Sequence, residues 1–207
     1  MGESSVFLTR ILDVLCGGGD KIAFAHRSRS MSYQETFDTL RRLHATLKSE
    51  GISPGQTVAV TGGNMPETIL LQIAAQLRGA KVVHVDRCSY GDVSPDHVLS
   101  SDPDGPLLLA SNGAKTAEAD IVMPRSVETL FLSKDAKPVS YSDVYEDMAR
   151  TCEPNPAGPQ QVLLIAPMSH PIGNRITVKA LLAGDTVVLH ERAPEAVQSS
   201  SATPPAR

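Results

Sequence analysis

Apolar residues recur at helical spacing in several stretches of the chain, and the clearest stretch follows a helix-start signal. Ser32, with Glu35 three residues later, forms a capping box, in which each side chain binds the backbone amide of the other residue. The apolar face that follows consists of Tyr33, Phe37, Leu40, Leu43 and Leu47. The pattern therefore predicts a helix that begins at Ser32 and ends before Gly51.

Short apolar runs bounded by turn residues predict strands between the helices. The predicted strands cover residues 22–25, 57–61, 81–85, 106–110, 121–123, 129–132, 162–166 and 184–191. Further helices are predicted over residues 4–15, 66–77, 141–152 and 175–183, and a weak one over residues 92–101. A strand, a helix and a strand within about thirty residues form a βαβ unit, which is right-handed and implies a parallel sheet.

This alternation predicts an α/β fold organised as one domain. We expect a three-layer domain over residues 1–195, with a mainly parallel sheet built from βαβ units. From residue 196 to residue 207 the composition turns to Ala, Pro and Ser, which predicts a disordered tail. At 207 residues the chain is long enough to bury a core of its own.

Composition and charge exclude several classes of partner. With a net charge of −4 and 4% aromatic residues, the chain lacks the basic surface and stacking residues that nucleic acids require. No apolar run approaches the roughly 18 residues that a membrane span needs. Cys16, Cys88 and Cys152 are widely spaced and predict neither a disulfide framework nor a metal site. We expect a cytoplasmic protein with reduced thiols, no metal, and no contact with nucleic acid or membrane.

Two glycine-containing turns suggest phosphate binding, but the residues around them argue against it. Residues 17–19 are three glycines, but they follow a helix and no Lys-Ser or Lys-Thr pair comes after them. Residues 62–64 lie between a strand and a helix, where free amides attract anions. Pro66 removes one of those amides, and no basic residue is close in sequence. We interpret the first turn as a helix end and the second as a tight connection between strand and helix.

His170 is the candidate functional residue that position alone suggests. It lies in the turn between a predicted strand and a predicted helix, and ligands of open α/β sheets gather at the carboxyl ends of strands. An imidazole there can orient a carboxylate or act as an acid or base. The structural alternative is a histidine that satisfies backbone groups in a proline-rich turn.

Three segments carry a resemblance to one enzyme superfamily. Residues 31–60 are similar to the run T-Y-x-E-L … G-V-x-x-G-D-x-V-A, and residues 64–80 to N-x-P-E … G-A. Residues 167–191 are similar to P-x-x-H-x-x-G … A-L-x-x-G-x-x-V-V-L-H-E. The matches in this last segment are Pro167, His170, Gly173, Ala180, Leu181, Gly184, Val187, Val188, Leu189, His190 and Glu191. The chain thus resembles the amino-terminal part of adenylate-forming enzymes, the superfamily of acyl-CoA ligases, adenylation domains and luciferases.

The resemblance implies a site on the acyl side and a defect on the nucleotide side. His170 would lie beside a carboxylate pocket, with Met168, Ser169 and Asn174 nearby. The family's glycine-rich phosphate loop would fall near residues 131–140. This stretch contains no glycine, and its remaining phosphate-facing candidates are Ser133, Lys134 and Lys137. The family's adenine, ribose and magnesium contacts and its catalytic lysine would follow residue 207, so no cofactor is expected.

Three hypotheses follow from this balance. The first is a truncated acyl-CoA-synthetase-like protein without ATP-dependent ligase activity, repurposed in a biosynthetic pathway to bind a small carboxylate or acyl compound. The second is an ATP-independent enzyme that uses His170 as acid or base on an acyl or polyketide-like substrate. The third is an interaction module that pairs with itself or with a full-length synthetase through apolar surface.

Overall fold

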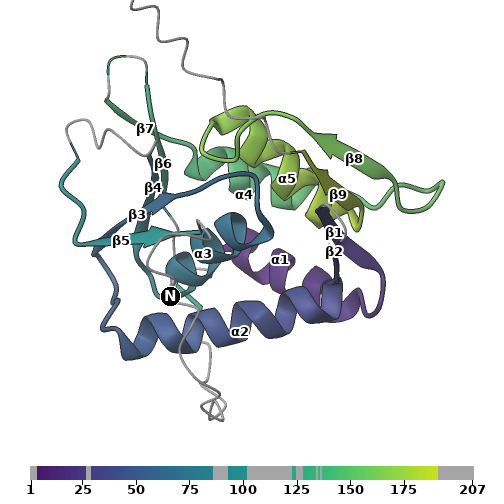
Figure 1. Ribbon diagram of the computed structural model, residues 1–207, viewed down its shortest axis with the longest axis horizontal. Helices are drawn as coiled ribbons and strands as arrows, with labels where there is room; N and C mark the ends of the chain where they lie inside the picture. Colours follow the sequence, from purple (N-terminus) through teal and green to yellow (C-terminus); the bar gives the residue numbers. More distant parts are fainter. Residues whose placement is uncertain are drawn as a thin grey trace, which may run out of the picture.

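The computed structural model describes residues 4–26, 29–85, 93–101, 123–124, 128–133, 135 and 137–190. Its helices are α1 (Val6–Gly17), α2 (Tyr33–Ser49), α3 (Pro66–Leu77), α4 (Ser142–Thr151) and α5 (Pro171–Ala183). Its strands are β1 (Ile22–His26), β2 (Arg29–Ser32), β3 (Thr57–Thr61), β4 (Lys81–His84), β5 (His97–Ser100), β6 (Glu128–Leu132), β7 (Pro138–Ser140), β8 (Gln161–Leu164) and β9 (Thr186–Leu189). The helices lie between strands at the two sides, with α3 in the middle (Figure 1).

The strands form two mainly parallel sheets where the sequence suggested one. The first has the order β2-β1-β9-β8, and the second has the order β5-β3-β4-β6-β7. Among the strands that the structure describes, the outer pairs β1–β2 and β6–β7 are antiparallel and the other pairs are parallel. The α/β class and the mainly parallel pairing are therefore confirmed. The division into two sheets arises because β1 pairs with β9, which follows it by more than 150 residues.

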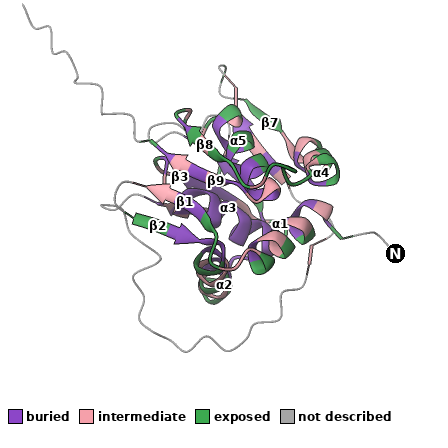
Figure 2. Cartoon of the chain, turned by 90° about the vertical axis from the view of Figure 1, so that its right-hand side faces the viewer, coloured by how far each residue is buried: buried purple, intermediate pink, exposed green. Residues whose placement is uncertain are grey.

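Helix α3 forms the centre of the molecule. Its residues from Thr68 to Leu77 are all buried, which is the pattern of a helix with protein on every side. It packs on β3 and β4 of the second sheet and against α2. Figure 2 shows this helix buried along its length, whereas α2 turns an exposed face outward.

Local signals place the helix ends close to where the sequence predicted them. In the capping box of α2, the Ser32 amide donates to Glu35 Oε2 at 2.7 Å, and the Glu35 amide donates to Ser32 Oγ at 3.1 Å. Pro66 is the first residue of α3, where its missing N–H costs nothing. Helix α5 ends at Gly184, which takes the left-handed conformation at φ 78°.

Other elements differ from the sequence-based expectation. Residues 97–100 form strand β5 beside β3, where a weak helix was predicted, because Asp96 fixes the end of this strand by accepting the Thr57 amide at 2.8 Å. Strands β2 and β7 were not predicted. Helix α5 begins at Pro171, one turn before the predicted start at residue 175. The predicted strand over residues 106–110, the first two residues of the predicted strand over 121–123 and the predicted tail over residues 196–207 lie outside the described residues.

No helix in the described part of the chain combines the length and the apolar character that crossing a bilayer demands. The longest of them, α2, has one polar face.

The turn of three glycines after α1 is shaped by packing. A Cβ on Gly18 would lie 2.5 Å from both Cβ and Cγ of Tyr33, whereas a Cβ on Gly17 would meet nothing within 4 Å. Tyr33 is fully buried and cannot retreat. The close approach of Gly18 to Tyr33 therefore explains why this turn, which ends helix α1, carries a glycine.

The two neighbouring glycines provide a matched pair of variants. We expect Gly18→Ala to lower the free energy of unfolding by about 2 kcal/mol, because the new methyl group overpacks the Tyr33 ring. Gly17→Ala should be neutral or stabilise α1 by up to about 1 kcal/mol, because alanine favours helix over glycine. Urea denaturation of both variants measures the difference. Equal stabilities of the two variants would contradict the packing explanation.

Candidate functional site

The carboxyl ends of strands from both sheets meet at the side chain of Asn64. Its amide nitrogen donates to the carbonyl oxygens of Ala166 at 3.1 Å and His190 at 3.3 Å. Its amide oxygen accepts the Met168 amide at 2.9 Å. These three bonds join the turn after β3 to the segments that follow β8 and β9. We call this meeting point the Asn64 junction; it holds the loop from Ala166 to His170 in place.

His170 lies in this loop and caps helix α5. Its Nδ1 accepts the Ile172 amide at 3.3 Å, and Pro171 occupies the first helical position. Because Nδ1 is the acceptor, the proton of the neutral ring is on Nε2. The His170 side chain is exposed, as is His190 immediately after β9. The sequence-predicted histidine is thus at the carboxyl end of parallel strands, and it also satisfies a backbone group.

The other residues predicted around His170 divide between surface and core. Ser169 is half-buried, whereas Met168 is 1% exposed and Asn174 is completely buried. Asn174 donates to the carbonyl oxygen of Met168 at 3.2 Å and so braces the loop from inside. The structure therefore brings Ser169 and His170 together at the surface and places Met168 and Asn174 beneath them.

Asn174 belongs to a buried polar cluster that also contains Gln72, His84 and Tyr145. Its oxygen accepts the Tyr145 hydroxyl at 2.6 Å, and its nitrogen donates to Gln72 Oε1 at 2.8 Å. His84 Nε2 lies 2.7 Å from the same Gln72 oxygen, and the His84 ring stacks on Phe131 at 4.8 Å. Burial lowers the pKa of His84 to about 3 and raises the pKa of Tyr145. The cluster is uncharged at neutral pH and stabilises the floor of the loop.

The stretch where a phosphate loop was expected forms a short hairpin between β6 and β7. The Ser133 amide donates to the Lys137 carbonyl oxygen at 2.8 Å, and the Lys137 amide donates to Ser133 Oγ at 3.1 Å. Both amides are therefore used within the hairpin. Lys134, the remaining predicted phosphate-facing residue, lies outside the described residues.

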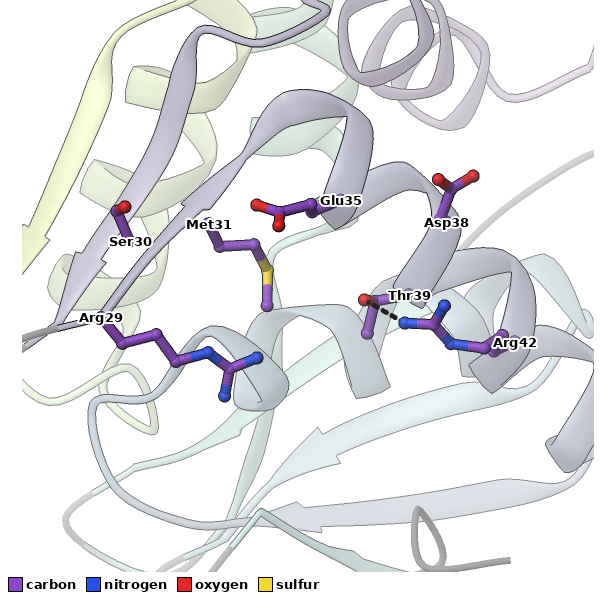
Figure 3. Close-up of a pocket in the computed structure, with 7 residues that line it drawn as sticks. All are labelled: Arg29, Ser30, Met31, Glu35, Asp38, Thr39 and Arg42. Carbon is purple, nitrogen blue, oxygen red and sulfur yellow. Dashed lines mark hydrogen bonds between the residues drawn. The ribbon is translucent and has the colours of Figure 1, made fainter. Parts of the chain in front are cut away.

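A polar hollow of about 270 Å³ lies at a separate place, between β2 and α2. Figure 3 shows the side chains of Arg29 and Arg42 approaching the hollow from opposite sides, with Met31 between them and the carboxylates of Glu35 and Asp38 in the upper part of the view. Its two guanidinium groups already have partners in the protein: Arg42 donates to Thr39 Oγ1 at 2.8 Å, and Arg29 lies 3.7 Å from Glu67. The balanced charge gives this hollow no preference for an anion, and we assign it no function.

Within the described ranges, no group of three or more His, Cys, Asp or Glu side chains is placed to hold a metal ion. Cys16 and Cys152 are free thiols, and Cys88 lies outside those ranges. Burial raises the pKa of the Cys152 thiol, so it is a poor nucleophile at neutral pH.

Comparison with known proteins identifies the origin of this arrangement. Residues 16–100 match the family model of the AMP-binding enzymes. The chain carries the N-terminal part of an adenylate-forming enzyme fold. The resemblance of its sequence motifs to this superfamily is thereby confirmed. In sequence, 68 residues are 41% identical to the acetoacetyl-coenzyme A synthetase of Rhizobium meliloti (strain 1021); they make up 31% of this chain and 10% of that enzyme.

Solved structures of adenylate-forming proteins share the whole fold. The N-terminal subdomain of Klebsiella oxytoca NpsA, in complex with 3-hydroxyanthranilyl-AMSN, matches with a TM-score of 0.70 and 18% identity over 92% of this chain and 54% of that one. The unliganded O-succinylbenzoate coenzyme A synthetase of Bacillus subtilis matches with a TM-score of 0.69 and 18% identity over 93% of this chain and 47% of the other. The chain thus spans about half the length of these two solved structures.

Proposed function

We propose that this adenylate-forming relative binds a small carboxylate or acyl compound and performs no ATP-dependent ligation on its own. The hairpin between β6 and β7 carries the proposal. Adenylation depends on amides, cations and Mg²⁺ that neutralise the phosphates. The amides of Ser133 and Lys137 are closed into the hairpin at 2.8 and 3.1 Å, and the sequence there contains no glycine that could open it into an amide-lined turn.

The acyl side retains a group suited to a carboxylate. With Nδ1 holding the end of α5, the neutral His170 ring presents Nε2–H to the surface as a hydrogen-bond donor. A ligand carboxylate beside it would accept that proton in a hydrogen bond. Two structural neighbours support this ligand class: O-succinylbenzoate CoA synthetase of Bacillus subtilis in complex with OSB-AMP, and the N-terminal subdomain of Klebsiella oxytoca NpsA in complex with 3-hydroxybenzoyl-AMSN.

The alternative of acid/base catalysis by His170 receives less support from the same geometry. For the neutral ring to take up a proton at Nδ1, it must surrender its bond to the Ile172 amide, which leaves a helix-terminal donor unpaired. Donation of a hydrogen bond from Nε2 needs no such change. An orienting role therefore fits the capped ring better than a general base does.

A binding experiment tests the role of His170. We expect His170→Ala to weaken binding of 3-hydroxybenzoyl-AMSN or of 3-hydroxybenzoate about tenfold, the loss of roughly one charge-assisted hydrogen bond. Isothermal titration calorimetry measures the change. Lys179→Ala, an exposed substitution on the same helix, is the matched control and should bind as the parent does. Unchanged affinity in His170→Ala would refute the assignment.

A second candidate, the interaction module, is favoured by apolar surface around β8. This strand is at the outer edge of its sheet, and Leu163 is 59% exposed. Ile165, just after the strand, and Ile172 on α5 are 61% and 56% exposed. An unprotected edge strand beside apolar side chains favours pairing with another strand. Light scattering of the parent and of Leu163→Gln tests self-association: a clean monomer in both cases would exclude pairing of the chain with itself.

A further inference from the structure

A second cavity lies at the end of the molecule opposite His170. Its volume is about 250 Å³, and it lies where α1 and α5 end and where β1 and β9 begin. We call it the amino-end cavity. Because β8 and β9 run parallel, the amino-end cavity and the Asn64 junction are at opposite ends of the same strands.

The walls of the amino-end cavity are largely apolar and firmly held. Val14, Leu182 and two prolines, Pro154 and Pro159, contribute to them. Tyr33 also lines the cavity, and its hydroxyl donates to the Asp185 carbonyl oxygen at 2.7 Å. The Tyr33 ring is fully buried and packs against Gly18, so it holds the cavity wall from behind, and ligand binding would cost little conformational entropy there.

The polar groups of the cavity are hydrogen-bond donors. Lys21 is exposed, and its ammonium forms no ion pair with any residue that the structure describes. Asn155 uses its side-chain oxygen to accept the Ala157 amide at 2.9 Å, which leaves its NH₂ group available. One cation and one amide donor beside an apolar wall select a ligand with an acceptor, preferably an anionic one, at one end.

The helix C-termini at this cavity do not reverse the preference for an anionic ligand. Two C-termini bring backbone carbonyls toward it, which by themselves would favour a cation. The carbonyl oxygens of Ala180 and Leu181 are already satisfied by the amides of Asp185 at 2.9 Å and Gly184 at 3.0 Å. The Gly18 carbonyl oxygen accepts the Lys21 amide at 3.4 Å. Among the described residues that line the cavity, Lys21 carries the one Lys, Arg, Asp or Glu charge, and the nearby Asp185 carboxylate accepts the Gln160 amide at 2.7 Å.

We propose that the amino-end cavity binds a compact apolar carboxylic acid, with its hydrocarbon body against Val14, Pro154 and Pro159 and its carboxylate at Lys21 and Asn155. The volume lies just below the roughly 300 Å³ at which small-molecule pockets usually begin, so a single ring or a short branched chain fits and a nucleotide does not. This site is independent of the one proposed at His170.

Fluorine NMR of the full chain with 4-fluorobenzoate as the probe tests the proposal. We expect saturable broadening of the probe signal with a Kd of about 1 mM or tighter. Gly17→Leu should weaken it, because a bulky side chain would be added at a residue that lines the cavity. Lys21→Gln should weaken 4-fluorobenzoate at least fivefold and leave the uncharged 4-fluorobenzamide unaffected. Lys48→Gln, an exposed cation on α2, is the control for nonspecific charge.

Two results of the fluorine NMR experiment would contradict binding in the amino-end cavity. No saturation by 4-fluorobenzoate, or equal affinity in the parent and Gly17→Leu, would overturn the proposal. Lys21→Gln keeps the test valid if Gly17→Leu fails to fold, because it changes only an exposed side chain. The part of the 4-fluorobenzoate binding that Lys21→Gln removes should persist in His170→Ala, because that part depends on the amino-end cavity. Loss of binding in His170→Ala alone would place the probe at the Asn64 junction and not in the amino-end cavity.

Discussion

Gly173→Ala should destabilise the protein by about 3 kcal/mol or more, the upper range for an overpacked core. A Cβ at this position would lie 2.2 Å from the carbonyl oxygen of Pro167 and 2.6 Å from that of Ala166. Neither carbonyl can move freely. The Pro167 oxygen accepts the His170 amide at 3.0 Å, and the Ala166 oxygen is bound by Asn64 at 3.1 Å. The methyl group would therefore push α5 away from the loop that it supports.

Urea denaturation of Gly173→Ala and of Arg175→Ala gives the comparison. Arg175 is exposed on the same helix, so its truncation should change the free energy of unfolding by less than about 0.5 kcal/mol. A loss below about 1 kcal/mol in Gly173→Ala would show that the loop yields and that its hydrogen bonds do not fix it. Because the loop carries His170, we also expect Gly173→Ala to weaken carboxylate binding at His170.

Acid should destabilise the protein through two buried histidines. Burial lowers the pKa of His84 to about 3. Burial first, and then the charges of Arg78 and Lys48, lower the pKa of His44 to about 4. Both are neutral in the folded protein and have a pKa of 6.5 when unfolded, so the unfolded state binds more protons below that pH. Stability is therefore complete above pH 6.5 and falls as the pH drops toward the folded pKa values.

His44→Leu isolates one of these contributions. His44 is 2% exposed, and its Nε2 has no hydrogen-bond partner within the described structure. At about pH 5 the folded protein should have lost about 2 kcal/mol for each buried histidine relative to about pH 7.5. His44→Leu should lose about 2 kcal/mol less than the parent over the same interval. His190→Gln, at an exposed histidine, should lose as much as the parent, and equal losses in all three proteins would contradict the burial of His44 as the cause.

The elements that the sequence predicted correctly are those whose signals are local. The capping box at Ser32 and Glu35, the proline at the start of α3 and the glycine at the end of α5 each act within a few residues. Helix α5 starts one turn earlier than predicted because His170 serves as its cap, and histidine is not among the residues that usually signal a helix start. The β1–β9 pairing depends on residues far apart in the chain, and no local pattern reports it.

The candidate site shows the same limit. His170 could be selected from its place between a strand and a helix. The sequence could not show that Asn174 faces the core, because a polar residue next to Arg175 is equally compatible with a position facing solvent. Its buried place becomes clear only from its hydrogen bonds to Gln72 and Tyr145. Asn64 was interpreted only as part of a tight turn. Its partners are more than 100 residues away in sequence, and a match to the N-x-P-E motif was the one signal that could have selected it.

ATP–pyrophosphate exchange by the purified chain tests the central claim most directly. The assay combines the chain with Mg²⁺, ATP, labelled pyrophosphate and a panel of aliphatic and aromatic carboxylic acids, with a full-length O-succinylbenzoate coenzyme A synthetase and its acid as the positive control. Because the Ser133 and Lys137 amides are closed into the β6–β7 hairpin, we predict no acid-dependent exchange above the protein-free background. Robust exchange that depends on both ATP and an acid would show that this chain activates carboxylates without a glycine-rich phosphate loop at that position, and would contradict the account.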